Sequence, residues 1–284
     1  MTIELRSMQE TDLAQGFRLS QQVSWPHRYQ DWQQALSLGE GVVAENQHGV
    51  VGCALLWQWG EARSTLGLVI VDPACQGQGI GKQLMQALLE KAAGGNVRLH
   101  ATEMGKGLYQ KYGFVVQCSV FQHQTAQLPE ISAPRPDATA GETVRPLRRE
   151  ELPALIEQDY QAHGLYRPAL WQDLLQSADA LLVLENPARP LGYMVIRKFG
   201  RGHVIGPMLA ADESSARKLF GYAAAQLTGQ FVRIDTYGNT AFSDWLSECG
   251  LPVVDAPLMM VRGTPWQRKP EAMADFSFMS QAMG

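Results

Sequence analysis

Short apolar runs alternate along this chain with stretches in which apolar residues recur every three or four positions. Residues 66–71 form a short apolar run that an Asp-Pro pair closes, a pattern that predicts a buried strand. Ile80, Leu84 and Leu88 then share one stripe, which predicts an amphipathic helix. This alternation of strand and helix patterns predicts an α/β (α+β) fold.

A glycine-rich loop, residues 76–82, joins this predicted strand to this predicted helix. Such a loop leaves backbone N–H groups free at a helix N-terminus, where the helix dipole favours a phosphate or pyrophosphate. A P-loop is excluded because Lys82 is followed by Gln83 rather than Ser or Thr. A dinucleotide-binding loop is disfavoured because residues 72–76 separate the glycines from the strand. The remaining alternative, a helix-capping loop without a ligand, is disfavoured by the cost of three alternating glycines.

Two separate motifs carry a family resemblance. Residues 76–81 have the pattern Gln-x-x-Gly-x-Gly, and residues 108–114 have the pattern Leu-Tyr-x-x-x-Gly-Phe. Both resemble motifs of the GNAT N-acetyltransferases: the loop that binds the pyrophosphate of acetyl-CoA, and a segment whose tyrosine lies near the CoA thiol. Trp25, Asp31 and Trp32 also resemble a helix of tandem GNAT proteins. The resemblance covers residues 1–126 well and the remainder more weakly.

The resemblance implies a site for acetyl-CoA. The pyrophosphate is expected on the amides of residues 77–82, and the pantetheine is expected to pair with the preceding strand as an added strand does. Tyr109 is expected to protonate the departing thiolate; a buried tyrosine with a satisfied hydroxyl is the structural alternative. The residues implied to contact acetyl-CoA are Leu68, Val69, Ile70, Val71, Gln76, Gly77, Gln78, Gly79, Ile80, Gly81, Lys82, Thr102 and Tyr109.

The acceptor pocket is less well defined by the sequence. Aromatic surfaces with a carboxylate nearby suit an amine that carries some apolar body. The general base stays unassigned, because Glu61, His100 and Glu103 are equally interpretable as structural or solvated residues. The candidate acceptor-binding residues are Trp25, His27 and Tyr29, from the helical hairpin that GNAT folds place over the acceptor, and Asp235 and Tyr237, from a later strand end.

A proline-rich polar connector, residues 129–141, divides the chain into residues 1–128 and 142–284. The second part repeats the first in register: Arg6-Ser7-Met8 matches Arg145-Pro146-Leu147, and Val43-Ala44-Glu45-Asn46 matches Val183-Leu184-Glu185-Asn186. Internal repetition predicts two copies of one fold. With the resemblance, this predicts two tandem GNAT-like domains, each a mixed, mostly antiparallel twisted sheet flanked by helices.

The second copy differs where the chemistry is expected. Opposite the glycine loop it has residues 210–215, in which Asp212 and Glu213 are expected to cap the helix and repel an anion. Leu246 stands opposite Tyr109 and has no proton to donate. This copy is therefore expected to be degenerate and to bind no acetyl-CoA, either lining the acceptor pocket or acting only as a scaffold.

Composition narrows the function classes. The chain has 284 residues, enough for two domains with cores of their own, and a net charge of −4 without a basic block, which argues against nucleic acid. No apolar run reaches a membrane span and no signal peptide opens the chain, so a cytoplasmic protein without a membrane partner is expected. The four cysteines lack metal-ligand spacing, so no metal is expected, and Cys53, Cys118 and Cys249 are interpreted as buried reduced thiols. The oligomeric state is not defined by the sequence.

The expected function is transfer of an acetyl group from acetyl-CoA to a primary amine of a small molecule, amino acid or peptide-like acceptor. The alternative is an acetyl-CoA-binding sensor or regulatory module without catalysis. Tyr109 favours the enzyme, because a sensor needs no acid beside the thiol.

Overall fold

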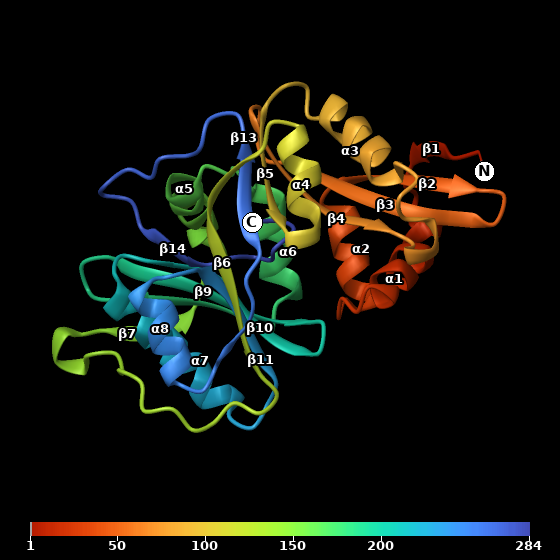
Figure 1. Cartoon of the computed structure of the whole chain (residues 1–284). Coiled ribbons are helices and arrows are strands. Elements are labelled where there is room, and N and C mark those ends of the chain that lie inside the picture. The colour runs from red at the N-terminus through yellow and green to blue at the C-terminus, as the bar shows by residue number, and fades with distance from the viewer. Residues whose placement is uncertain (1) are drawn as a thin grey trace.

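The computed structural model describes residues 2–284, in which two halves of similar architecture share one continuous sheet (Figure 1). The elements of the first half are β1 (Glu4–Ser7), α1 (Leu13–Gln22), α2 (Tyr29–Ser37), β2 (Glu40–Asn46), β3 (Gly49–Gln58), β4 (Arg63–Val71), α3 (Ile80–Lys91), β5 (Asn96–Ala101), α4 (Glu103–Lys111) and β6 (Val115–Thr125). Those of the second half are β7 (Thr143–Pro146), α5 (Leu152–His163), α6 (Pro168–Ser177), β8 (Ala180–Glu185), β9 (Pro190–Phe199), β10 (Gly202–Ala210), α7 (Glu213–Leu227), β11 (Val232–Tyr237), α8 (Ala241–Glu248), β12 (Val253–Asp255), β13 (Leu258–Arg262) and β14 (Ala274–Ser277).

The internal repeat is reproduced down to single side chains. In the first half Arg6 binds Asp12 at 2.7 Å and Glu45 at 2.8 Å, which ties β1 to the next turn and to β2. In the second half Arg145 binds Glu151 and Glu185 in the same way, at 2.6 Å and 2.7 Å. The prediction of two copies of one fold, each with a mostly antiparallel sheet and flanking helices, is confirmed.

The two halves exchange their last long strands. The order across the sheet is β1-β2-β3-β4-β5-β13-β6-β11-β10-β9-β8-β7, so β13 lies between β5 and β6, and β6 pairs with β11. In Figure 1, β6 runs between the halves with β13 beside it. The division into domains at residues 1–128 and 142–284 stays a proposal. It divides the sequence but not the sheet, because β13 of the second segment completes the sheet of the first.

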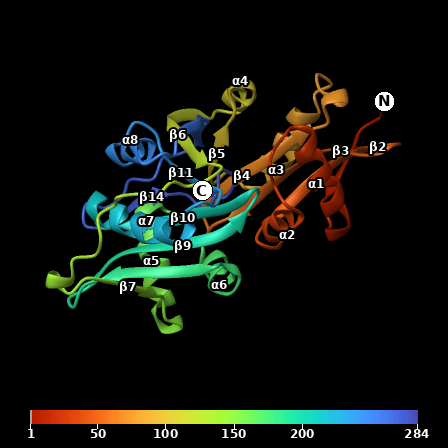
Figure 2. The same ribbon diagram turned by 90° about the horizontal axis from the view of Figure 1, so that it is seen from below.

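Helices cover both faces of the sheet and bury its apolar side chains. One core lies between α3, α4 and the first half of the sheet; a second packs α7 and α8 onto the other half. A third is shared by α1, α2, α5 and α6, and includes the fully buried Trp32 and Trp171 at equivalent places. Trp32 therefore packs these helices together. Seen from below, the halves lie side by side with the C-terminus between them (Figure 2).

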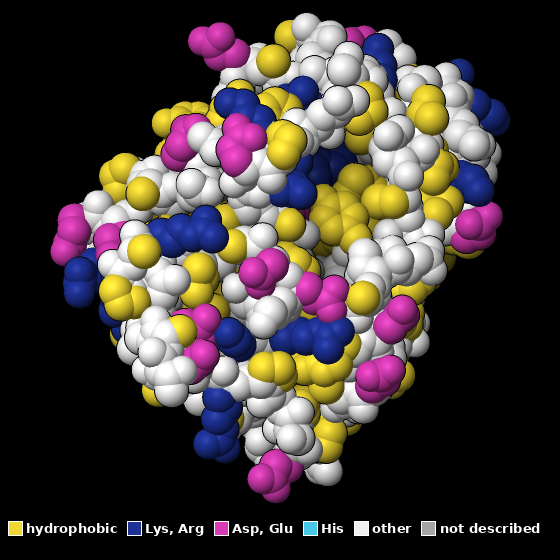
Figure 3. All heavy atoms as spheres, turned by 90° about the vertical axis from the view of Figure 1, so that its left-hand side faces the viewer, with side chains coloured by type: hydrophobic (Ala, Val, Ile, Leu, Met, Phe, Trp, Pro, Cys, Tyr) yellow, Lys and Arg dark blue, Asp and Glu magenta, His cyan; other side chains and the backbone are white. Residues whose placement is uncertain are grey.

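Two further expectations concern cysteines and membranes. All four cysteines are free, but only Cys53 is fully buried; Cys118 and Cys249 are half-buried. Within residues 2–284 no helix combines the length and the apolar character needed to cross a membrane. One face of the molecule carries acidic and basic side chains intermixed, without a large patch of one sign (Figure 3).

Candidate functional site

The strands β4 and β5 separate halfway along their length. They pair in parallel only from Arg63 to Thr65, opposite Asn96 to Arg98. Leu68 then adopts a left-handed backbone, with φ of 51°, where the register between β3 and β4 shifts. Beyond Thr65 the edge of β4 that faces β5 therefore has no partner strand in the described sheet, and its backbone groups are free to pair with an extended ligand.

The predicted glycine loop lies at the end of β4 and leads into α3. Gly77 and Gly79 have φ of 77° and 79°, a conformation that side chains disfavour, and a Cβ at either would meet no atom within 4 Å. Gly79 caps α3, and the first bond of that helix runs from Gln83 N to Gly79 O. The amides before Gln83 therefore point out of the helix N-terminus unpaired, which favours an anion.

A cavity of about 520 Å³ joins the loop to the gap between β4 and β5. We call it the β4 cavity. It includes most of the residues expected to contact acetyl-CoA or the acceptor. These are Trp25, His27, Leu68, Val69, Val71, Gln76, Gly77, Gly79, Ile80, Gly81, Lys82, Thr102 and Tyr109.

Five of the expected residues do not line the β4 cavity. Gln78 lies in the exposed loop, and Ile70 is buried in the core shared by the halves. Tyr29 and Tyr237 each line a different cavity. Asp235 is buried and holds Arg233, which does line the β4 cavity.

Tyr109 projects from α4 with its ring nearly enclosed, at 9% exposed. The ring packs edge-on against Phe114, and a Cβ at Gly105 would lie 2.9 Å from it. Its hydroxyl makes no hydrogen bond within the described chain. Burial raises the pKa of Tyr109 to about 12, so the hydroxyl keeps its proton at neutral pH.

Two histidines bring unpaired ring nitrogens to the same cavity. His27 Nδ1 and both ring nitrogens of His100 are buried and meet no hydrogen-bond partner among residues 2–284. Burial lowers the pKa of His27 to about 4 and that of His100 to about 3. Both rings are therefore neutral at physiological pH. The backbone of Gln281 interacts with the His100 ring and raises its pKa slightly, but the lone pair of each neutral ring has no hydrogen-bond partner among residues 2–284.

The second half closes the far side of the β4 cavity. Arg233 donates to Asp235 from Nε and Nη2, which leaves Nη1 without a bond in the described chain. Its guanidinium lies 5.6 Å from the centre of the Phe199 ring, against which His27 packs edge-on. Residues 280–282 complete the wall, and a Cβ at Gly67 would lie 2.8 Å from that of Ala282.

Sequence reasoning missed this C-terminal wall and the role of Gly105. The contact between Gly67 and Ala282 joins residues far apart in the chain, and no local pattern marks it. The only signal for the wall was the run of small residues at the chain end. Gly105 stands in the quoted motif region, and the ring it makes room for is that of Tyr109.

The corresponding gap in the second half is filled by the chain itself. β10 and β11 pair only at His203 and Val204, and β14 then pairs with β10 at residues 208–210. Phe278 N donates to Asp235 O at 3.0 Å, which ties the segment after β14 to β11. Asp212 caps α7 by accepting from Ser215 N at 2.7 Å, as the sequence predicted.

No group of three or more metal-binding side chains gathers anywhere between residues 2 and 284. The arrangement thus offers amides for an anion, a free strand edge, a protonated tyrosine and neutral imidazoles, all facing one cavity.

Two segments of this chain match models described as Acetyltransferase (GNAT) domain, one at residues 37–116 and one at residues 155–273. The chain is similar to an uncharacterized N-acetyltransferase, YitH, of Bacillus subtilis (strain 168), with 26% identity over 99% of this chain and 98% of the relative. It is also 26% identical to the holothin acyltransferase of Pseudoalteromonas sp. (strain SANK 73390), over 69% of this chain and 66% of that protein.

Solved structures share the fold at low identity. A candidate acetyltransferase from Pyrococcus horikoshii matches with a TM-score of 0.79 and 20% identity, over 99% of this chain and 96% of that one. A tandem GNAT protein from the clavulanic acid biosynthesis pathway matches with a TM-score of 0.67 and 13% identity, over 94% and 100%.

Proposed function

We propose that this chain, which belongs to the GNAT acetyltransferases, transfers the acetyl group of acetyl-CoA to a primary amine of a small molecule, amino acid or peptide-like acceptor. It is an acyltransferase, as are the relatives that it matches by name. The observation that carries the proposal is the β4 cavity, in which free helix amides, a free strand edge, Tyr109 and His100 meet.

The residues present fit acetyl-CoA. The unpaired amides from Gly77 to Lys82 would hold the pyrophosphate, because no Cβ blocks Gly77 or Gly79. The free edge of β4 at residues 66–71 would pair with the pantetheine amides. When bound, acetyl-CoA supplies an acyl group activated as a thioester.

Tyr109 would act as the acid of the transfer. Its proton is retained at neutral pH and its hydroxyl is not engaged elsewhere, so it is free to donate to the sulfur as the carbon–sulfur bond breaks. The neutral ring of His100 would accept a hydrogen bond from the attacking amine and orient its lone pair. We assign no general base, since the low pKa of His100 makes it a weak one.

One acetyl-CoA is expected per chain. In the second half β14 occupies the gap that the pantetheine would enter, and Asp212 already caps the helix that would meet the pyrophosphate. The second half would instead line the acceptor end of the β4 cavity through Phe199, Arg233 and residues 280–282. Asp235 would act there by holding Arg233 in place.

The test is the release of free CoA thiol from acetyl-CoA in the presence of a library of primary amines, with mass analysis of each product. Release with formation of an N-acetylated product is expected for a subset of amines. Tight binding of acetyl-CoA without turnover on any amine would favour the sensor or regulatory module instead. Calorimetry that finds two acetyl-CoA per chain would contradict the role given to β14.

A further inference from the structure

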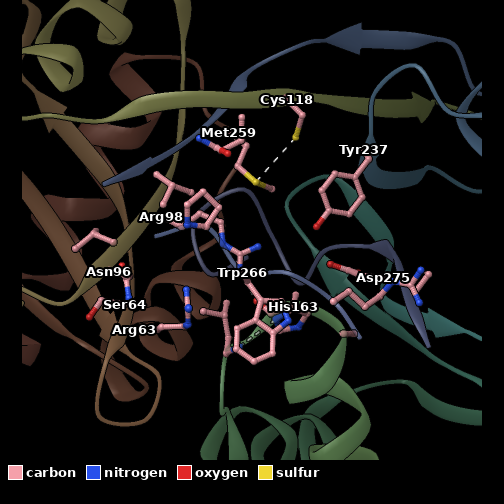
Figure 4. Close-up of a pocket in the computed structure, with 18 residues that line it drawn as sticks. Arg63, Ser64, Asn96, Arg98, Cys118, His163, Tyr237, Met259, Trp266 and Asp275 are labelled. Atoms are coloured by element: carbon pink, nitrogen blue, oxygen red, sulfur yellow. Dashed lines mark hydrogen bonds between the residues drawn. The ribbon is translucent and has the colours of Figure 1, made fainter. Parts of the chain in front are cut away.

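A second cavity, of about 390 Å³, lies beside the C-terminal segment and shares no lining residue with the β4 cavity. Figure 4 shows Arg63, Arg98 and Trp266 on one side of it, and Tyr237 and Asp275 on another. Arg268 also lines it, from the loop between β13 and β14. We call this cavity the arginine cleft, after Arg63, Arg98 and Arg268.

None of the three arginines forms an ion pair within residues 2–284, although the charge of Arg98 acts on Asp275 across the cleft. All the ion pairs that arginines form within these residues involve arginines outside the cleft, such as Arg6, Arg145 or Arg233. Those of the cleft bind only main-chain oxygens: Arg63 donates to Thr264 O and Arg98 to His163 O, both at 3.2 Å, and Arg268 donates to Ala272 O. Each guanidinium carries five N–H donors, so most of them stay available.

The cleft gathers like charge that it does not neutralise. Burial and the charge of Arg98 both lower the pKa of Arg63. Two half-buried cations that repel each other cost folding free energy, and a bound anion would remove that cost. Arg98 also lies against Gly284, so Arg63 and Arg268 are the arginines most open to a ligand.

A fixed aromatic wall stands beside these cations. The guanidinium of Arg63 lies 5.0 Å from the centre of the Trp266 ring, and the Tyr160 ring packs at 5.4 Å. Trp266 Nε1 donates to Gln161 O at 3.3 Å, and a Cβ at Gly164 would lie 2.4 Å from the indole. The indole is thus held in one position and offers apolar surface to the body of a ligand.

The opposite wall is neutral or weakly acidic. Burial raises the pKa of Asp275 to about 7, and burial also raises the pKa of Tyr237 above its usual range. These groups form hydrogen bonds without adding a full negative charge near neutral pH. An anionic group is therefore favoured at the Arg63 end of the cleft, with the rest of the ligand toward Tyr237.

We propose that the arginine cleft binds a small organic oxyanion, a carboxylate or phosphate group on a compact apolar body, at a site separate from the β4 cavity. Its volume is in the range of small-molecule sites, and the guanidinium fork matches both oxyanions. The ring of Phe278 stands between the two cavities, packed on His100 of one and on Tyr237 of the other. A ligand of the cleft therefore does not compete with acetyl-CoA.

The test titrates the full chain with phenyl phosphate and with phenylacetate, by calorimetry and by tryptophan fluorescence, with and without saturating CoA. Binding of at least one probe is expected, with affinity unchanged by CoA and weakened by salt. The stronger probe identifies the oxyanion. Inorganic phosphate and acetate should bind more weakly than their phenyl counterparts, because they do not use Trp266.

The variants Arg63→Gln and Arg268→Gln should each weaken the probe about tenfold or more, the range for a lost charge-assisted hydrogen bond. Arg268 is exposed at the rim, so its change leaves the fold intact. Arg135→Gln, at an exposed arginine outside both cavities, is the matched control and should leave the affinity unchanged. Three results would each overturn the proposal: no binding of either phenyl probe, an affinity in both cleft variants equal to that of the original chain, or displacement of the probe by CoA. Acetyl-CoA affinity, measured in the same variants, should be unchanged because neither arginine lines the β4 cavity. A failure of the cleft proposal can therefore be distinguished from a failure of the proposed transfer reaction.

Discussion

Replacing Tyr109 with Phe removes one oxygen and leaves the packing of the site in place. The ring fits between Gly105 and Phe114, and Phe preserves both contacts. Because the hydroxyl makes no hydrogen bond to the described chain, its loss should change the free energy of unfolding by less than about 0.5 kcal/mol. An effect on turnover can therefore be assigned to the missing proton donor.

The expected loss is about 10²- to 10⁴-fold in kcat, the range for a residue that transfers a proton in the transition state. This corresponds to about 2.7–5.4 kcal/mol of activation free energy. Acetyl-CoA affinity should stay nearly the same, because the helix amides and the edge of β4 that would hold it are untouched.

The assay follows the release of CoA thiol under saturating acetyl-CoA and amine, with acetyl-CoA affinity measured by calorimetry. Tyr112→Phe is the matched control: it removes the same atom from a tyrosine three positions along the chain, which does not line the β4 cavity and whose hydroxyl donates to Lys82 O at 2.9 Å. Its kcat should remain within about threefold of the original.

Two results would refute the reasoning. A normal kcat in Tyr109→Phe with weakened acetyl-CoA binding would make Tyr109 a binding residue. The second result concerns the pH profile of kcat. If kcat falls at high pH with an apparent pKa well below 12 in the original chain, and this fall is absent from Tyr109→Phe, the Tyr109 hydroxyl is not buried and protonated as described.

Three further predictions follow from single contacts. Gly79→Glu should lower acetyl-CoA affinity about 100-fold or more in calorimetry, because a carboxylate would face the free amides; Gly94→Glu, with the same left-handed φ and open surroundings, controls for strain and should bind normally. Gly67→Ala should raise the KM of the amine severalfold by pushing Ala282 into the β4 cavity. Adding Ala282→Gly should restore the KM only in part, because it removes the 2.8 Å contact with the Ala282 Cβ and leaves the 2.9 Å contact with its Cα; a KM unchanged by the second substitution would separate the two residues. Burial lowers the pKa of His27 and His163 to about 4 and that of His100 to about 3. Because each ring is protonated more easily in the unfolded chain, the free energy of unfolding falls as the pH drops from 6.5 toward these values. The loss is about 2 kcal/mol for each histidine at about pH 5. Asp275, whose pKa is raised to about 7, acts in the opposite sense below that pH, so urea titrations should show a net loss of about 3 kcal/mol between about pH 7 and pH 5; constant stability would contradict the buried neutral state of the histidines.

The sequence predicted the parts of the site that depend on local conformation. The left-handed turn at Gly79 and the cap of α7 at Asp212 are set by neighbouring residues, so glycine and aspartate mark them directly. The repeat was visible because Arg6 and Arg145 serve one network in two copies. Each of these features can be identified from a short window of the chain.

The parts that the sequence did not predict depend on contacts between distant segments. Tyr237 was placed at the acceptor because it ends a strand equivalent to β5, yet its ring turns to the arginine cleft and packs on Phe278. Arg233 was overlooked because the sequence analysis assigned acceptor binding to Asp235, two residues further on. In the structure the Asp235 carboxylate holds the Arg233 guanidinium, and it is Arg233 that lines the cavity. No local pattern records which way a strand-end side chain turns when another segment covers the strand.

The shared sheet gives a physical reason for keeping a second copy that has lost its loop. Without β13 the edge of β5 would be open, and a long exposed strand edge invites pairing with other chains. Without residues 278–282 the ring of His100 would lose Phe278, its burial and therefore its depressed pKa. The second half thus completes the sheet through β13 and sets the chemistry of the β4 cavity through residues 278–282. In the second half β14 fills the gap between β10 and β11, so this half can supply the wall of the β4 cavity without binding a ligand in its own gap. The absence of a glycine loop from the second half therefore does not affect the proposed site.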